Sequence, residues 1–171
     1  HAVGHSAGSI FHSHFLPACR AHGAEFASLQ LLAPAVTCAE FKRYLRQMSV
    51  KDGKPPRTTM FTMNRHQERA DNCAQVYRKS LLYFVSNALE TDQRLPILGL
   101  ERIHDTGYSG WDGSSDTGEA LAAWRAAAAQ AKLADRTTVL DSDRITTAIA
   151  ANGRPAATQA PGHGSFDNDI D

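Results

Sequence analysis

Residues 4–8, Gly-His-Ser-Ala-Gly, match the pattern G-x-S-x-G, which forms a sharp turn between a strand and a helix. Two apolar residues, Ala2 and Val3, precede this pentapeptide as the end of a strand. An amphipathic segment, residues 9–22, follows it, with apolar side chains at helical spacing: Ile10, Phe11, Phe15, Leu16 and Cys19. The sequence therefore predicts a strand, a tight turn and a helix, with Ser6 raised clear of the sheet.

Both glycines of the pentapeptide have an expected steric role. The turn is so sharp that side chains two residues before and after Ser6 would collide, and glycine at positions 4 and 8 is expected to remove both clashes. The backbone N–H of Ala7 would point to where a carbonyl oxygen develops negative charge. The pentapeptide thus predicts a nucleophile, Ser6, and an oxyanion donor, Ala7.

The rest of the chain alternates between strand-like and helix-like segments. Apolar, β-branched and aromatic content predicts strands at 26–33, 58–63, 96–100, 137–140 and 156–160. Helical spacing or propensity predicts helices at 38–48, 73–90 and 119–134, and a short one capped by Ser142 or Asp143 that ends at residues 152–153. This alternation predicts an α/β fold with a mostly parallel sheet flanked by helices.

A serine hydroxyl becomes a good nucleophile only when a base removes its proton, and His163 is the best candidate for that base. Of the eight histidines, it alone lies late in the chain after a strand-like segment, between two glycines that would leave its ring free to approach the serine. Histidine follows serine and the acid in the chain order of such sites. His5, inside the pentapeptide, is expected to pack beside the site.

The carboxylate that would orient the histidine is less sharply indicated. Asp71 is the first choice, because it follows the expected strand at 58–63, and Glu68 is the second. Asp71 could instead cap a helix that begins near Cys73. Asp141 and Asp143, which follow the expected strand at 137–140, remain a third option.

Composition excludes several classes of protein. The 171 residues are about one domain's worth, and 18 basic residues balance 18 acidic ones, which argues against binding nucleic acid through bulk charge. No apolar run is long enough to span a membrane. The histidines and the three cysteines lack metal-ligand spacing, and no phosphate-binding loop is present, so neither a metal nor a cofactor is expected. Without a cysteine framework or a visible leader, the cytoplasm is the default compartment.

The chain resembles the α/β-hydrolase fold superfamily. The resemblance rests on the turn at 4–8, the helix–strand pattern after it, and Gly-His-Gly-Ser-Phe-Asp at 162–167. Segments 78–90 (RKSLLYFVSNALE) and 96–102 (PILGLER) are similar to those of bacterial hydrolase-like proteins of unassigned substrate. The resemblance implies a serine hydrolase that cleaves an ester, thioester or amide bond of a small-molecule or acyl substrate. In it, Ser6 attacks, His163 acts as base and then acid, and Asp71 orients His163.

The resemblance covers only the C-terminal portion of that fold. Such a fold has strands, and a loop with a second oxyanion donor, before the nucleophile, whereas few residues precede Gly4 here. We therefore expect residues 1–171 to form a partial domain that pairs with an upstream segment of the same protein or with a partner chain, without which the enzyme could be inactive. The alternative is a non-catalytic interaction module with a hydrolase-like scaffold.

Overall fold

The centre of the fold is a parallel sheet of four strands in the order β1-β2-β3-β4. In the computed structural model, the described residues are 1–49, 53–73, 75–90, 94–104, 115–130, 137–141 and 162–166. The strands are β1 (Ala2–His5), β2 (Ser28–Leu32), β3 (Arg57–Thr62) and β4 (Thr137–Asp141). Each pairs in parallel with the next, so all four carboxyl ends lie at one edge. The predicted α/β class is confirmed.

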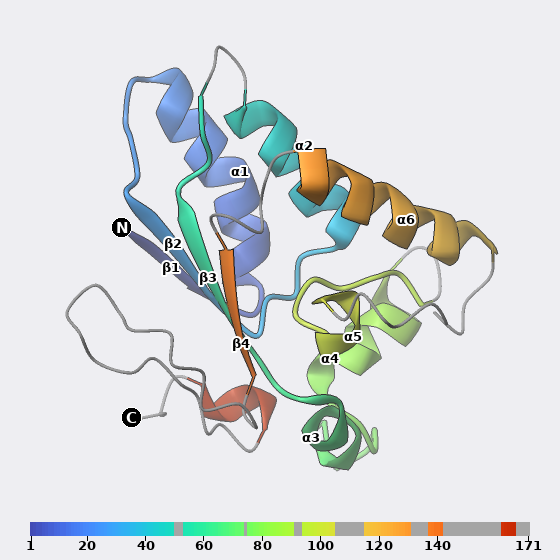
Figure 1. Ribbon diagram of the computed structural model, residues 1–171. Coiled ribbons are helices and arrows are strands. Elements are labelled where there is room, and N and C mark those ends of the chain that lie inside the picture. The colour runs from blue at the N-terminus through green and yellow to red at the C-terminus, as the bar shows by residue number, and fades with distance from the viewer. Residues whose placement is uncertain are drawn as a thin grey trace.

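Three long helices pack side by side on one face of the sheet (Figure 1). They are α1 (Gly8–Ala21), α2 (Cys38–Met48) and α6 (Ser115–Gln130). Helix α2 begins where predicted, because the Thr37 side chain accepts the backbone N–H of Glu40 and so caps its first turn. Short helical segments complete the described chain: α3 (Arg65–Ala70), α4 (Leu81–Phe84), η2 (Val85–Leu89), α5 (Glu101–His104) and η4 (His163–Ser165).

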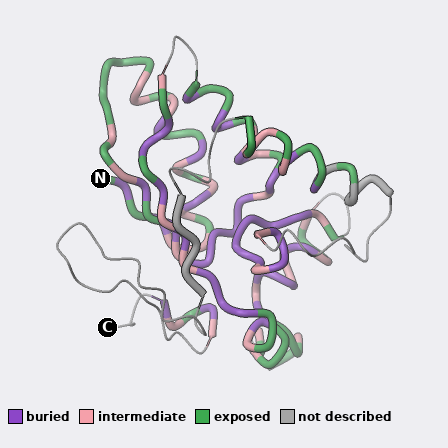
Figure 2. Tube along the Cα trace, in the orientation of Figure 1, coloured by how far each residue is buried: buried purple, intermediate pink, exposed green. Residues whose placement is uncertain are grey.

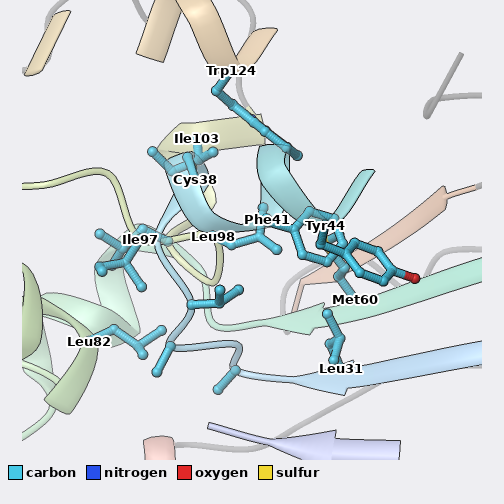
Figure 3. Close-up of a cluster of buried hydrophobic side chains, with 14 of the residues drawn as sticks. Leu31, Cys38, Phe41, Tyr44, Met60, Leu82, Ile97, Leu98, Ile103 and Trp124 are labelled. Atoms are coloured by element: carbon cyan, nitrogen blue, oxygen red, sulfur yellow. The ribbon is translucent and has the colours of Figure 1, made fainter. Parts of the chain in front are cut away.

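The core lies between the sheet and these helices. Figure 2 shows buried residues along β1, β2 and β3 and at intervals along the helices. In Figure 3, Trp124 of α6 extends toward Phe41 of α2, and the two rings meet edge to face at 5.8 Å. Met60 and Leu31 contribute to the same cluster from the strands. This packing buries the aromatic side chains that fix α2 and α6 against the sheet.

The other face of the sheet is less well covered. Along each of the first three strands, buried residues alternate with more exposed ones, and Val3 on β1 is 57% exposed. Parallel sheets are normally covered on both faces. Strand β1 is also an edge strand, and two phenylalanines of the helix that follows it, Phe11 and Phe15, are exposed and stacked on each other at 4.9 Å.

The predicted long helix at 73–90 is wrong in its first half. The backbone at Cys73 forms a bridge with Tyr77, and Gln75 has a positive φ, so this part of the chain turns. The Ser80 side chain accepts the N–H of Tyr83, so the helix begins only at α4. The helix then continues as the π-helical segment η2. The spacing of apolar residues in 73–90 predicted too long a helix, because such spacing contains no information about these local hydrogen bonds.

The predicted strand at 96–100 is also wrong. Ile97 forms only an isolated bridge with Thr37, and Gly99 donates its N–H to the carbonyl of Pro34. A Cβ at Gly99 would lie 2.6 Å from that same oxygen. The apolar residues here are buried in a turn that packs closely against backbone, which an apolar run alone does not distinguish from a strand.

Other expected elements are matched or fall outside the described residues. The strands near 26–33, 58–63 and 137–140 are present within two residues of their predicted bounds, as is the first helix, which continues through Pro17. Helix α6 begins four residues earlier than predicted. The expected helix ending at 152–153 and the strand at 156–160 lie outside the described residues. Among the helices that are described, none is both long and apolar enough to cross a membrane.

Candidate active site

The turn between β1 and α1 places Ser6 in a strained conformation. Its φ is +50°, in the left-handed region that side chains rarely adopt, at a cost of about 1–3 kcal/mol. Hydrogen bonds to the main chain of Ser6 hold the turn, one of them from the N–H of Ser9 to the Ser6 carbonyl at 3.0 Å. The N–H of Ser6 donates to the carbonyl of Leu32 (2.9 Å), and the carbonyl of Ser6 accepts from the N–H of Ala35 (3.2 Å) and from the hydroxyl of Ser9 (2.6 Å). Strain at one residue persists because its neighbours fix the backbone on both sides.

The two glycines of the turn are not equivalent. A Cβ at Gly4 would lie 2.8 Å from the backbone carbon of Gly8 and 2.9 Å from its oxygen, so β1 and α1 approach each other only because residue 4 has no side chain. A Cβ at Gly8 would meet nothing within 4 Å. The expectation that both glycines relieve a clash is therefore wrong for Gly8, because a side chain at that position would extend into open space.

We expect Gly4→Ala to destabilise the fold by roughly 1–3 kcal/mol, because the clash is with backbone that cannot rotate away. Gly8→Ala is the matched control. It adds the same methyl group in open space at the start of a helix, and we expect a stability equal to or slightly above that of the wild type. Urea unfolding of the two variants measures the difference. Equal losses of stability would show that the close contact at Gly4 does not constrain the turn.

The structure brings Ser6 and His163 together from opposite ends of the chain. His163 Nε2 lies 2.9 Å from Ser6 Oγ, within the range needed for direct proton transfer. His163 begins the short helix η4 and is buried, whereas Ser6 is partly exposed. A substrate can therefore reach the hydroxyl while the imidazole is shielded from water.

Burial lowers the pKa of His163 from its ordinary value of 6.5 to about 4. Desolvation is the largest cause, the nearby His5 lowers the pKa further, and Asp71 raises it. The imidazole is therefore neutral at pH 7. Its Nε2 can then accept the Ser6 proton, with its own proton on Nδ1.

The backbone of His163 is held from two sides. Its N–H donates to Asp71 Oδ2 at 3.1 Å, and its carbonyl accepts a hydrogen bond from His5 Nε2 at 3.0 Å. The His5 ring also lies 5.3 Å from the His163 ring and 6.3 Å from that of Phe166. The predicted place of His5 beside the site therefore matches the geometry, whereas its hydrogen bond to the carbonyl of His163 was not predicted.

Asp71 lies beside His163 but contacts its main chain, not its ring. In the described part of the chain, His163 Nδ1 is buried without a hydrogen-bond partner. In a Ser–His–Asp triad the carboxylate accepts a hydrogen bond from the Nδ1–H of the histidine. Asp71 also follows the last residue of α3, so it ends that helix and does not begin the next. The structure thus places the first-choice acid near the base in a different role from the expected one.

The other carboxylates considered are placed elsewhere or not described. Glu68 is buried, and its carboxyl accepts a hydrogen bond from the hydroxyl of Ser80. Desolvation raises its pKa to about 8, so it is mainly protonated at pH 7 and a poor partner for an imidazolium. Asp141 is the last residue of β4, and Asp143 lies outside the described residues.

Two further residues shape the site. Ala7, the predicted oxyanion donor, is exposed directly before α1, so a substrate can approach its backbone. Ser9 was not predicted, although its position three residues after Ser6 is typical of a serine that bonds to the backbone of a turn. Its hydroxyl donates to the carbonyl of Ser6 and accepts the N–H of Val36, which joins the turn to the segment after β2.

No protein-family model, curated protein or solved structure matches this chain. The functional argument therefore rests on the geometry of the site. Among the residues that the structure describes, no cluster of histidine, cysteine and acidic side chains could hold a metal ion.

Proposed function

We propose that this protein is a serine hydrolase that cleaves an ester, thioester or amide bond. The observation that carries the proposal is the 2.9 Å contact between Ser6 Oγ and the Nε2 of a neutral, buried His163, at a turn strained to φ +50°. A strained turn that presents a hydroxyl to an imidazole is the arrangement that nucleophilic acyl transfer needs.

In this mechanism Ser6 Oγ attacks the substrate carbonyl carbon while His163 Nε2 takes the hydroxyl proton. The oxygen of the tetrahedral intermediate carries the negative charge, which the N–H of Ala7 stabilises. When the bond to the leaving group breaks, His163 returns its proton to that group, leaving an acyl-Ser6 ester. Water then attacks this ester, again with His163 as base, and releases the acid and the free serine.

The fold supports an assignment to the C-terminal portion of an α/β-hydrolase domain. The nucleophile follows a parallel strand directly and precedes a helix, and the base arrives from the far end of the chain. Strand β1 is an edge in the described sheet, with Val3, Phe11 and Phe15 exposed next to it. An exposed strand edge beside an apolar surface can accept further strands, which would complete a sheet with the nucleophile strand inside it.

Covalent labelling with a fluorophosphonate probe tests the proposed function. We expect one equivalent of probe per chain, attached to the tryptic peptide that contains Ser6. Heat-unfolded protein is the control, because it keeps the serine but loses the contact with His163. Labelling of folded and unfolded protein at the same rate, or at a different serine, would contradict the proposal.

The alternative is an interaction module that keeps the scaffold without the chemistry. The unpartnered Nδ1 of His163 favours it, because an imidazole without an acceptor on its far nitrogen is a weaker base. Folded protein that neither labels nor turns over activated esters would support this alternative.

The role of Asp71 predicts an unusual response to mutation. Asp71→Asn keeps an oxygen that can accept the N–H of His163, so we expect a loss in kcat/KM below about ten-fold, where loss of a triad carboxylate costs about 10⁴-fold. Asp71→Ala removes the acceptor and should cost more than Asp71→Asn. Ester hydrolysis by the two variants measures this order. A loss near 10⁴-fold in Asp71→Asn would show instead that the carboxylate reaches Nδ1 during catalysis.

The lowered pKa of His163 predicts activity that persists in acid. His163 is competent only when neutral, so kcat/KM should fall as the pH drops through about 4 and not through 6.5. His5→Gln keeps a donor for the His163 carbonyl but removes the ring that lowers the pKa of His163, so we expect its acidic limb to move to higher pH. A pH–rate profile of both proteins is the measurement. A wild-type limb near 6.5 would contradict a desolvated base.

A further inference from the structure

The buried carboxyl of Glu68 has no role in the mechanism above. Glu68 is the buried residue of α3, with 1% of its surface exposed. Its Oε2 accepts a hydrogen bond from the Ser80 hydroxyl, and its Oε1 is buried without a hydrogen-bond partner in the described part of the chain. An unpartnered oxygen costs far more on a charged carboxylate than on a neutral acid, so these surroundings favour the protonated form of Glu68.

Glu68 also fixes the position of α3. The N–H of Ser80 donates to the main-chain carbonyl of Glu68, so Ser80 holds both the backbone and the side chain of this residue. Ser80 is at the same time the cap of α4, and in Figure 1 α3 lies against the start of that helix. The other residues of α3 are exposed or half-buried. The attachment of this short helix therefore depends strongly on one carboxyl group.

Asp71 connects α3 to the base of the proposed site. It follows the last residue of the helix, and its Oδ2 accepts the N–H of His163 at 3.1 Å. It also lies against Gly162, where a Cβ would be 3.1 Å from Asp71 Oδ1. Asp71 is half-buried, whereas Glu68 is enclosed, so Asp71 is the carboxylate of the two that can move. A displacement of Asp71 would shift the main chain of His163, and with it the Nε2 that faces Ser6 Oγ.

The charges around Glu68 come from α5 and from Asp71. Burial is the largest cause that raises the pKa of Glu68, to about 8, and the hydrogen bond from Ser80 lowers it. Asp71 raises this pKa, Arg102 on α5 lowers it by less than Asp71 raises it, and Glu101 on α5 raises it slightly. An ionised Glu68 is therefore repelled by Asp71 more strongly than it is attracted by Arg102.

We propose that Glu68 is a positioning residue: its uncharged carboxyl keeps Asp71 against the N–H of His163, and its ionisation at alkaline pH displaces Asp71 and slows proton transfer at Ser6. The proposal rests on the proposed hydrolase function and adds a pH-dependent control of that site. The two carboxyls belong to residues three apart in sequence, and like charges repel more strongly when one of them is shielded from water. The proton that Glu68 loses goes to solvent.

The pH dependence of the hydrolysis of a 4-nitrophenyl ester tests this role. We expect kcat/KM of the wild type to fall by roughly three-fold or more between pH 7 and pH 9.5, mainly through kcat, because a displaced base accepts the serine proton less often. Glu68→Gln keeps a neutral side chain that cannot ionise, so its profile should be flat over this range. Glu25→Gln, which removes an exposed carboxylate between α1 and β2, is the matched control and should show the same fall as the wild type.

Asp71→Asn is the second variant, and it keeps the test decisive where Glu68→Gln is unstable. It removes the charge that an ionised Glu68 would repel and keeps an oxygen for the N–H of His163, so its profile should also be flat. The amide signal of His163 in a ¹⁵N–¹H NMR spectrum measures the same displacement without turnover. This signal should shift between pH 7 and pH 9.5 in the wild type and stay in place in both variants.

Fluorophosphonate labelling at pH 7, measured on the same samples, separates the two proposals. Normal labelling with a flat wild-type profile, or with an alkaline fall that Glu68→Gln retains, overturns the role of Glu68 and leaves the hydrolase intact. Absence of labelling and turnover overturns the hydrolase. In that case a His163 amide signal that shifts in the wild type alone would still support the control of Asp71 by Glu68, and a signal that does not shift would overturn this control as well.

Discussion

Ser6→Ala is expected to abolish fluorophosphonate labelling and to lower ester hydrolysis by about 10⁴-fold or more, the scale at which loss of a catalytic nucleophile acts. The hydroxyl is the only group of the residue that reaches His163 Nε2. The turn itself should survive the change, because its hydrogen bonds involve the main chain of Ser6 and the hydroxyl of Ser9. Activity and circular dichroism of the same sample therefore separate chemistry from folding.

Ser13→Ala is the matched control for this prediction. Ser13 lies on α1, the helix that follows the turn at Ser6, and is buried. Its hydroxyl donates to the carbonyl of Ile10 within α1. We expect it to label and turn over like the wild type. If Ser6→Ala labelled as fast as Ser13→Ala, the nucleophile would lie elsewhere and the proposed function would be lost.

Local patterns predicted the nucleophile end of the site well. The turn at 4–8 depends on contacts within a few residues, such as the approach of Gly4 to Gly8, and such contacts leave a short signature in the sequence. Helix α2 begins at the predicted residue for the same reason, because Thr37 caps it locally. Where the chemistry of a few neighbouring residues decides the structure, the sequence is sufficient to predict it.

The parts of the site that depend on contacts between distant residues could not be predicted in detail from the sequence. The sequence singled out Asp71 as a neighbour of His163, but nothing in the spacing of two residues 92 positions apart indicates whether a carboxylate meets a ring or a main-chain N–H. The same holds for the bond from His5 to the carbonyl of His163.

His163→Ala is expected to lower ester hydrolysis by roughly 10⁴-fold or more, because His163 Nε2 is the base that contacts Ser6 Oγ and the serine proton then loses this acceptor. Labelling should slow as well, since the fluorophosphonate also needs a deprotonated serine. The substitution leaves a space where the ring was buried. Added imidazole should therefore restore part of the activity, which loss of the fold alone would not allow.

The control for His163→Ala is His22→Ala, which removes an exposed histidine at the end of α1 and should have no effect. The activity of His5→Gln should lie between those of His163→Ala and His22→Ala. This substitution keeps a donor for the His163 carbonyl and disturbs only the surroundings of the base. This order follows from the distance of each group from the transferred proton. Wild-type activity in His163→Ala would mean that the 2.9 Å contact with Ser6 is structural, and the interaction module would then be the better account of the protein.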